Sequence, residues 1–247
     1  VACYQPLIDS LNPSQSVYGI QVTDFGQVAK YNYQVEDLAA HYIKQMGPLA
    51  AESSLTLGGW SLGATLAFEM AYQIDQQYGN QPAVLVLDQP APSITIDHSA
   101  DMSESERLTY FASKVEQYAG TSFNITNDQL INMTPMERST LFLSAFQKSH
   151  LVPDNITAQD FQYFLAILQA HLNATDQYQG RIYRGKVVVI EAQDILQGRI
   201  KQAQAGLGWQ HYTQKPVSLF TTQGDHISMM TPPFVSGLAK QLKEVIV

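Results

Sequence analysis

One serine of the chain lies in a pattern that can make its hydroxyl a nucleophile. Ser61 is the middle residue of Gly59-Trp60-Ser61-Leu62-Gly63, which follows a short apolar stretch and precedes a helix-forming one. This context predicts a sharp turn from a strand into a helix, with glycines where the chain must pass close to itself. At the start of the helix, the backbone N–H of Leu62 can stabilise a negatively charged oxygen. We therefore expect nucleophilic catalysis at Ser61, with Leu62 as a donor of the oxyanion hole.

A nucleophilic serine needs a base and a carboxylate that orients the base. Two carboxylates follow apolar stretches that are predicted strands: Asp88 comes after 83–87, and Asp194 comes soon after 186–190. The carboxyl ends of parallel strands form the rim where α/β sheets place their ligands. Asp88 could instead only cap the turn that begins at Pro90. Position alone leaves the choice of acid open.

His226 is the candidate base because it follows the last predicted strand, 217–221, late in the chain. Serine, acid and histidine then occur in the order expected of α/β-hydrolases. The other five histidines lie within predicted helices, in a helical block described below, or before the last strand: His41, His98, His150, His171 and His211. We interpret these five as surface residues.

Strands and helices are predicted to alternate over the first 90 residues, which is typical of a mostly parallel sheet flanked by helices, the α/β class. Helices are expected at 1–11, at 35–46 and after the turn at 59–63, and strands at 17–22, at 55–58 and at 83–87.

From about residue 97 to residue 178 this alternation stops, and three helices are expected at 104–118, 135–148 and 157–172. A helical block inserted at the ligand-binding rim of a sheet is typical of a lid over the active site. Strand character returns after it, and a final helix is expected at 234–245.

The composition argues against several functions. The 247 residues suit one α/β domain, and 45% of them are apolar and 15% charged, as in folded proteins. The net charge of −8 and the scattered basic residues argue against a nucleic-acid partner. Cys3 is the only cysteine, which rules out an intrachain disulfide and a cysteine-rich metal site. No stretch reads as a signal peptide or a membrane span, so we expect a cytoplasmic protein with no bound metal and no membrane partner.

With these residues in place, the chain resembles the C-terminal, type I thioesterase domains of nonribosomal peptide synthetases and polyketide synthases, within the α/β-hydrolase superfamily. The resemblance covers nearly the whole chain and is carried by three stretches: Gly59 to Ala64, Leu87 to Pro92, and Gly224 to Met230. It implies an α/β-hydrolase fold for a single domain of residues 1–247, with the helical block at about 97–178 as a lid.

The resemblance also implies a reaction and a partner. In such domains an acyl, peptidyl or polyketide chain arrives as a thioester on the phosphopantetheine of a carrier domain. It passes to the serine and is released by hydrolysis or macrocyclisation, and the domain itself binds no cofactor. Because the acid of this family follows the strand after the nucleophile helix, Asp88 is favoured over Asp194. The implied catalytic residues are Ser61, Asp88 and His226.

Two features depart from the family pattern. An N-terminal strand and a His-Pro-x-Gly-Gly-like loop with the second oxyanion donor are expected before Val1, and we expect the sequence to be incomplete there. Gly63 is followed by Ala64, where many terminal domains have a second glycine. Two other functions stay open: a free-standing carboxylesterase or lipase with the same triad, and a non-catalytic binding domain with the hydrolase fold.

Overall fold

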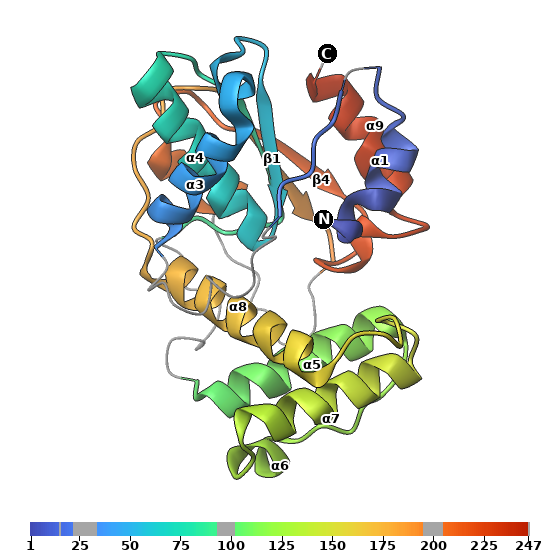
Figure 1. The fold of residues 1–247 in the computed structure, drawn as a ribbon. Coiled ribbons are helices and arrows are strands. Elements are labelled where there is room, and N and C mark those ends of the chain that lie inside the picture. The colour runs from blue at the N-terminus through green and yellow to red at the C-terminus, as the bar shows by residue number, and fades with distance from the viewer. Residues whose placement is uncertain (15, 22–33, 93–101, 195–204, 247) are drawn as a thin grey trace. The chain divides into compact units, whose positions relative to one another are not determined.

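The computed structural model of the protein describes residues 1–14, 16–21, 34–92, 102–194 and 205–246 (Figure 1). The described chain forms two compact units. The sheet unit contains all described residues up to 92 and from 171 onward, and the helical unit contains residues 102–170.

The sheet unit is built on four parallel strands in the order β1-β2-β3-β4. The strands are β1 (Thr56–Trp60), β2 (Ala83–Leu87), β3 (Val187–Ala192) and β4 (Ser218–Thr222). The apolar runs of β2 and β3 are buried nearly throughout, as expected for strands that are covered on both faces. The predicted α/β class with a parallel sheet is therefore confirmed.

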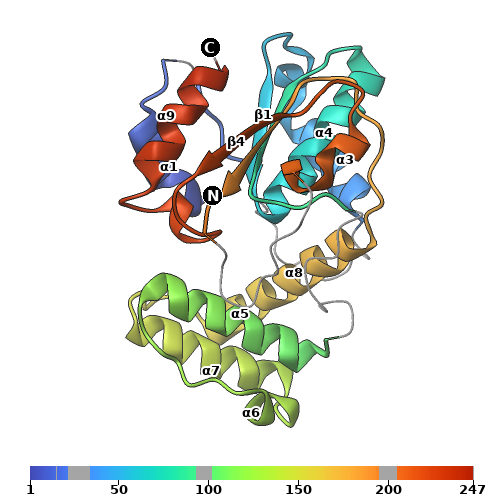
Figure 2. The same cartoon turned by 180° about the vertical axis from the view of Figure 1, so that it is seen from behind.

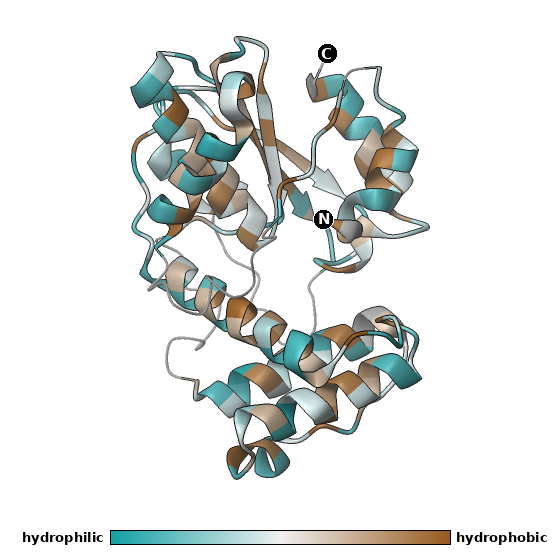
Figure 3. Cartoon of the chain, viewed as in Figure 1, coloured by the Kyte–Doolittle hydropathy of each residue, from teal (hydrophilic) through white to brown (hydrophobic). Residues whose placement is uncertain are grey.

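Helices cover both faces of this sheet (Figures 1 and 2). One face packs against α3 (Val35–Met46), the short turn η2 (Gly47–Ala51) and α4 (Leu62–Tyr78), in a core cluster that includes the fully buried Phe68. The other face packs against α1 (Gln5–Leu11) and α9 (Val235–Ile246). Figure 3 shows brown and teal residues alternating around these helices, the pattern of amphipathic helices with one buried face.

The helical unit has its own apolar core, which is rich in phenylalanine and includes the buried Phe142, Phe146 and Phe161. Its helices are α5 (Glu104–Ala119), α6 (Asn127–Ile131), α7 (Pro135–Lys148) and α8 (Ala158–Gln177), whose last turns belong to the sheet unit. Three of the helices begin with reciprocal capping boxes, in which a Ser or Thr side chain and a Glu or Gln side chain bond each other's backbone N–H: Ser103 with Glu106, Thr126 with Gln129, and Thr134 with Glu137.

Several expected elements differ from the structure. The strand expected at 17–22 does not form over residues 16–21, where Val17 is 49% and Tyr18 is 68% exposed. No described strand pairs with this segment, and an apolar stretch cannot make a strand without a partner for its backbone groups. The expected loop at 209–212 belongs to an irregular 3-10 segment, η4 (Ala205–Tyr212), which the three positive-φ residues 206–208 interrupt. Helix α6 was not expected.

In the described ranges no helix reaches both the length and the apolarity needed to cross a bilayer. Within the same ranges, no three His, Cys, Asp or Glu side chains are grouped closely enough to share a metal ion.

Candidate active site

Ser61 lies at the turn between β1 and α4 with a strained backbone. Its φ of 55° and ψ of −134° are values that residues other than glycine rarely adopt. Its N–H donates to the carbonyl of Leu87 at 3.1 Å, which continues the β1–β2 ladder through the turn. A Cβ added to Gly59 would lie 2.0 Å from the backbone carbon of Gly63, so the turn requires glycine at 59. Such strain costs roughly 1–3 kcal/mol and is typical of functional turns.

Helix α4 begins directly after this serine, at Leu62. The first N–H groups of a helix have no acceptor within it, and the helix dipole makes this end positive. The backbone N–H of Leu62 therefore lies at the positive end of α4, and its role as an oxyanion-hole donor stays a prediction.

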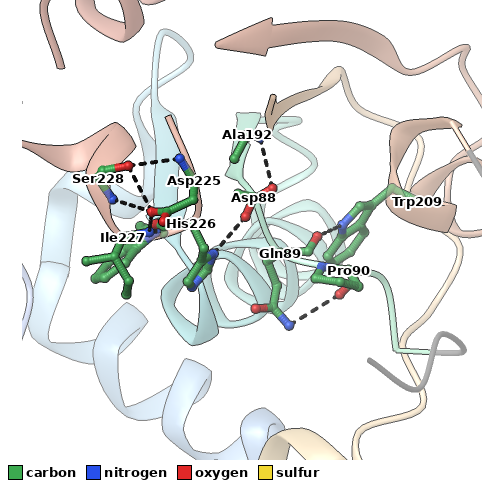
Figure 4. A network of polar contacts seen from close by, with 10 residues as sticks. Asp88, Gln89, Pro90, Ala192, Trp209, Asp225, His226, Ile227 and Ser228 are labelled. Atoms are coloured by element: carbon green, nitrogen blue, oxygen red, sulfur yellow. Dashed lines mark hydrogen bonds and ion pairs between the residues drawn. The ribbon is translucent and has the colours of Figure 1, made fainter. Parts of the chain in front are cut away.

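Asp88 follows the last residue of β2 and also has a positive φ, of 48°. Its N–H donates to the carbonyl of Ile190 at 2.9 Å, which keeps it in the ladder with β3. The side chain is buried, and one carboxylate oxygen, Oδ1, accepts the N–H of Ala192 at 2.9 Å (Figure 4). The other, Oδ2, lies 2.8 Å from Nδ1 of His226. The carboxylate is thus held by backbone on one side and faces the imidazole on the other.

The loop that carries His226 is held by contacts of its own. The Oδ1 atom of Asp225 accepts the N–H of Ile227 at 3.0 Å, and the N–H and the hydroxyl of Ser228 at 2.8 Å each (Figure 4). A Cβ on Gly224, whose φ is +89°, would meet the Ser228 hydroxyl at 2.9 Å. The short helical turn η5 (Ser228–Met230) follows, with both methionines buried. Asp225, Ser228 and Gly224 therefore define the backbone conformation of the loop that carries His226.

Trp60 connects the serine turn to the histidine loop. Its indole N–H donates to the carbonyl of His226 at 2.8 Å, and its ring stacks on the imidazole with centroids 5.1 Å apart and an angle of 30° between the planes. The backbone N–H of Trp60 donates to the hydroxyl of Tyr4, at 2.9 Å. No role in the site was predicted for Trp60 or Tyr4. The only sequence feature that could have pointed to Trp60 is its position beside Ser61. A backbone N–H donor such as that of Ala192 cannot be recognised from the residue type.

The structure brings Asp88 and His226 together and keeps the other acidic candidate away from the imidazole. Asp194 is exposed, its N–H donates to the carbonyl of Gly224 at 3.0 Å, and among the described residues its carboxylate does not contact His226. Among the described residues, no hydrogen bond joins the Ser61 hydroxyl to the His226 imidazole. Such bonds are often long before substrate binds.

The remaining histidines lie elsewhere. His41, on α3, His150, which follows α7, and His211 are exposed, as expected of surface residues. His171 differs from the expectation, because its burial in α8 lowers the pKa of its imidazole. His98 lies outside the described residues.

The family comparison agrees with the resemblance seen in the motifs. The model of the family described as "Thioesterase domain" matches residues 1–243. Chondramide synthase of Chondromyces crocatus is 26% identical over 250 residues, and orsellinic acid synthase of Emericella nidulans is 21% identical over 255 residues. These matches cover 98% and 97% of this chain but only 6% and 12% of the two synthases.

Solved structures show the same fold. A four-domain nonribosomal peptide synthetase, bound to AMP and glycine, matches with a TM-score of 0.86 and 22% identity over 99% of this chain and 18% of its own. The RedJ thioesterase of the prodiginine pathway in Streptomyces coelicolor matches with a TM-score of 0.62 and 17% identity over 99% and 81% of the two chains. The predicted resemblance is confirmed, and the chain belongs to the thioesterase domain family, a family of acyl-transfer hydrolases.

Proposed function

We propose that this domain releases an acyl, peptidyl or polyketide chain from the phosphopantetheine arm of a carrier domain through an acyl-serine intermediate. The observation that carries the proposal is the contact between the buried Asp88 and the half-buried His226 at the strand rim, together with a serine on a strained turn that leads into a helix. This is the set of groups that nucleophilic acyl transfer requires. The family match supplies the substrate class, a thioester.

In the first half of the reaction, Nε2 of His226 takes the proton of Ser61 as the serine oxygen attacks the thioester carbonyl. Asp88 accepts a hydrogen bond from Nδ1–H, which holds the tautomer with a free Nε2 and stabilises the imidazolium that forms. The Leu62 N–H stabilises the tetrahedral oxyanion. The carbon–sulfur bond then breaks, the imidazolium returns the proton to the leaving thiolate, and acyl-Ser61 remains.

In the second half, water or a hydroxyl or amine of the bound chain attacks acyl-Ser61, with His226 again taking the proton. The serine oxygen leaves and is reprotonated, and the product is a free acid or a ring. This half uses the same residues in the same roles, because each proton that His226 accepts is returned before the next cycle.

The carrier domain is part of the proposal. The relatives include proteins named chondramide synthase, orsellinic acid synthase and non-reducing polyketide synthase, and the four-domain structure is a nonribosomal peptide synthetase. We infer that the partner of this domain is an acyl or peptidyl carrier domain, that the domain itself holds no cofactor, and that the helical unit serves as the lid.

The experiment is intact-protein mass spectrometry after mixing with an acyl-pantetheine thioester. The wild type is expected to gain the mass of one acyl group and to release thiol, whereas Ser61→Ala gains no mass. Acylation of Ser61→Ala at another residue would contradict the assignment of the nucleophile. A matched oxygen ester with the same acyl group separates a thioesterase from a carboxylesterase, and a strong preference for the ester would contradict the proposed substrate class.

A further inference from the structure

We propose that Trp60 is a positioning residue that fixes the His226 imidazole on the serine turn, so that the nucleophile and its base are held as one body. The inference rests on the proposed function of the same site. It assigns a role to a side chain that does not itself exchange protons with the substrate.

The first argument is that Trp60 belongs to the nucleophile turn. It is the last residue of β1 and directly precedes Ser61. Its backbone N–H is held by the Tyr4 hydroxyl at 2.9 Å, and the neighbouring Ser61 N–H is held by Leu87 at 3.1 Å. The backbone of residues 60 and 61 is therefore held by hydrogen bonds, and a side chain at position 60 has a fixed place relative to Ser61.

The second argument is that the indole holds His226 by two contacts of different kinds. The N–H bond to the His226 carbonyl, at 2.8 Å, fixes the backbone of the loop at the residue that carries the base. The ring stack, at 5.1 Å between centroids, fixes the plane of the imidazole, and this distance is within the range of aromatic pairs. The Asp88 contact acts on Nδ1 in the plane of the ring. The three contacts together leave the imidazole little freedom.

The third argument is chemical. When His226 takes the serine proton it becomes a cation, and the face of an indole within about 6 Å attracts a cation. Tryptophan is the one side chain that combines this face with an N–H that can reach a carbonyl. Phenylalanine at position 60 would keep a ring but lose the donor, and leucine would lose both, so the two contacts can be tested separately.

Among the described residues, Asp88, Asp225 and Tyr4 hold this part of the site, and each of them makes hydrogen bonds of its own. Asp88 faces Nδ1 from the end of β2, and Asp225, in the same loop, bonds Ile227 and Ser228. Tyr4 bonds the backbone of Trp60, and burial raises the pKa of its hydroxyl, so that it stays neutral at physiological pH.

The experiment compares Trp60→Phe and Trp60→Leu with the wild type in steady-state kinetics on an acyl-pantetheine thioester. We expect kcat to fall about tenfold in Trp60→Phe and about 10²-fold in Trp60→Leu, with little change in KM, since misplacing a catalytic group lowers kcat. The substrate-independent readout is the low-field NMR resonance of the His226 Nδ1 proton. It should weaken in Trp60→Phe and disappear in Trp60→Leu, as a loosened loop lets this proton exchange with water.

Trp209 provides the matched control, since the chain has two tryptophans. Its indole N–H donates to the carbonyl of Gln89 at 2.6 Å (Figure 4). Its ring packs on Phe68 in the core. Trp209→Phe should therefore lower the melting temperature and keep the resonance of His226. If Trp60→Leu keeps wild-type kcat and the resonance, or loses kcat only in proportion to its folded fraction, the proposal is wrong.

These outcomes are separable from failure of the proposed function. If the wild type has no thioesterase activity, the resonance of His226 still reports whether Trp60 holds the ring. If Trp60→Leu does not fold, Trp60→Phe, which keeps an aromatic ring in the same place, decides the question through the weakened resonance.

Discussion

The sheet unit and the helical unit place their carboxylates in opposite ways. In the described sheet unit three carboxylates are buried: Glu69, Asp75 and Asp88. Each has a partner far away in the sequence, namely Tyr178, Arg184 and His226. In the described helical unit the buried polar residues are two serines, Ser105 and Ser139, and the carboxylates at the helix starts are exposed and bond the backbone three residues away.

The two units therefore differ in how their carboxylates depend on the rest of the chain. A buried carboxylate is costly unless it is paired, so each of the three depends on distant parts of the chain being in place. The capping carboxylates depend only on their own helix. We therefore expect substitutions in the sheet unit to have large, non-local effects, and substitutions in the helical unit to have small, local ones.

Asp88→Asn should have the largest effect on activity. The amide keeps the shape of the side chain but can offer its NH₂ to Nδ1 of His226, which favours the wrong tautomer of the base. By analogy with the same change in serine proteases, kcat should fall about 10⁴-fold. The measurement is kcat on an acyl-pantetheine thioester, with circular dichroism to verify folding.

Asp194→Asn is the matched control for the acid, because Asp194 also follows a strand end but is exposed and makes no described contact with His226. Its activity should stay close to that of the wild type. Loss of activity in Asp194→Asn together with full activity in Asp88→Asn would reverse the assignment of the acid.

Gly59→Ala should have the largest effect on stability. The added Cβ would lie 2.0 Å from the carbon and 2.1 Å from the oxygen of the Gly63 backbone, neither of which can move without opening the turn. We expect a loss of more than about 4 kcal/mol of unfolding free energy, or no folded protein. Urea denaturation measures this loss.

Gly58→Ala is a close control, one residue away on the same strand. There the nearest atom to an added Cβ is the Leu85 Cβ at 3.4 Å, which is ordinary contact, and Gly58 has no positive φ. The change should be tolerated within about 1 kcal/mol. Equal losses for the two variants would mean that strand propensity, rather than the close approach at Gly63, sets the requirement for glycine.

Much of the fold was predictable because its signals are local. The helix at 35–46, the strand at 83–87 and the helix at 135–148 have the bounds that apolar periodicity, glycine and proline indicated. The prediction of a strand at 17–22 was wrong because a strand needs a partner strand, which its own residues do not specify. Ser61, Asp88 and His226 were marked by positions at strand ends, and their catalytic roles stay predictions.

The contacts that hold these residues were not predictable. Trp60 and His226 are 166 positions apart, and the donor to the Asp88 Oδ1 atom is a backbone N–H, which every residue except proline has. The partner of Glu69 is Tyr178, 109 positions away, which directly follows the end of α8, a helix that was expected to end at residue 172. Long-range pairing of this kind leaves no periodic signal in the sequence.

Glu69→Gln tests the buried carboxylate that has no catalytic role. Burial raises the pKa of Glu69 above its usual value of 4.5, although Tyr178 and Gln73 donate hydrogen bonds to it. The folded protein therefore holds this proton more tightly than the unfolded chain. The contribution of Glu69 is most favourable below pH 4.5 and is lost as the pH rises through the raised pKa.

The expected result is a pH-dependent difference between the two proteins. Relative to Glu69→Gln, the wild type should gain unfolding free energy as the pH is lowered from 7 to below 4.5, by about 1.4 kcal/mol for each unit by which the pKa is raised. Urea denaturation at a series of pH values measures it. A difference that is constant with pH would show that Glu69 has the same pKa in both states.

Thr134→Ala should have the smallest effect, confined to the helical unit. The Thr134 hydroxyl accepts the N–H of Glu137 at 3.3 Å, and the Glu137 carboxylate accepts the N–H of Thr134 at 2.7 Å. Losing the cap should cost about 1 kcal/mol. Thr140→Ala, on the exposed face of the same helix, should be neutral or slightly stabilising, because alanine is the better helix former. Hydrogen exchange of the α7 amides compares the two variants.

The capping box should also respond to acid with the opposite sign from Glu69. The backbone and side-chain hydrogen bonds from Thr134 lower the pKa of Glu137 below its usual 4.5. Its contribution is therefore present above pH 4.5 and is lost as the pH falls through the lowered pKa. Acid should increase exchange at the start of α7 in the wild type and less in Thr134→Ala, where part of the box is already missing. If acid affected both proteins equally, the box would not be what stabilises this helix start, and the contrast between local and long-range carboxylates would not hold at Glu137.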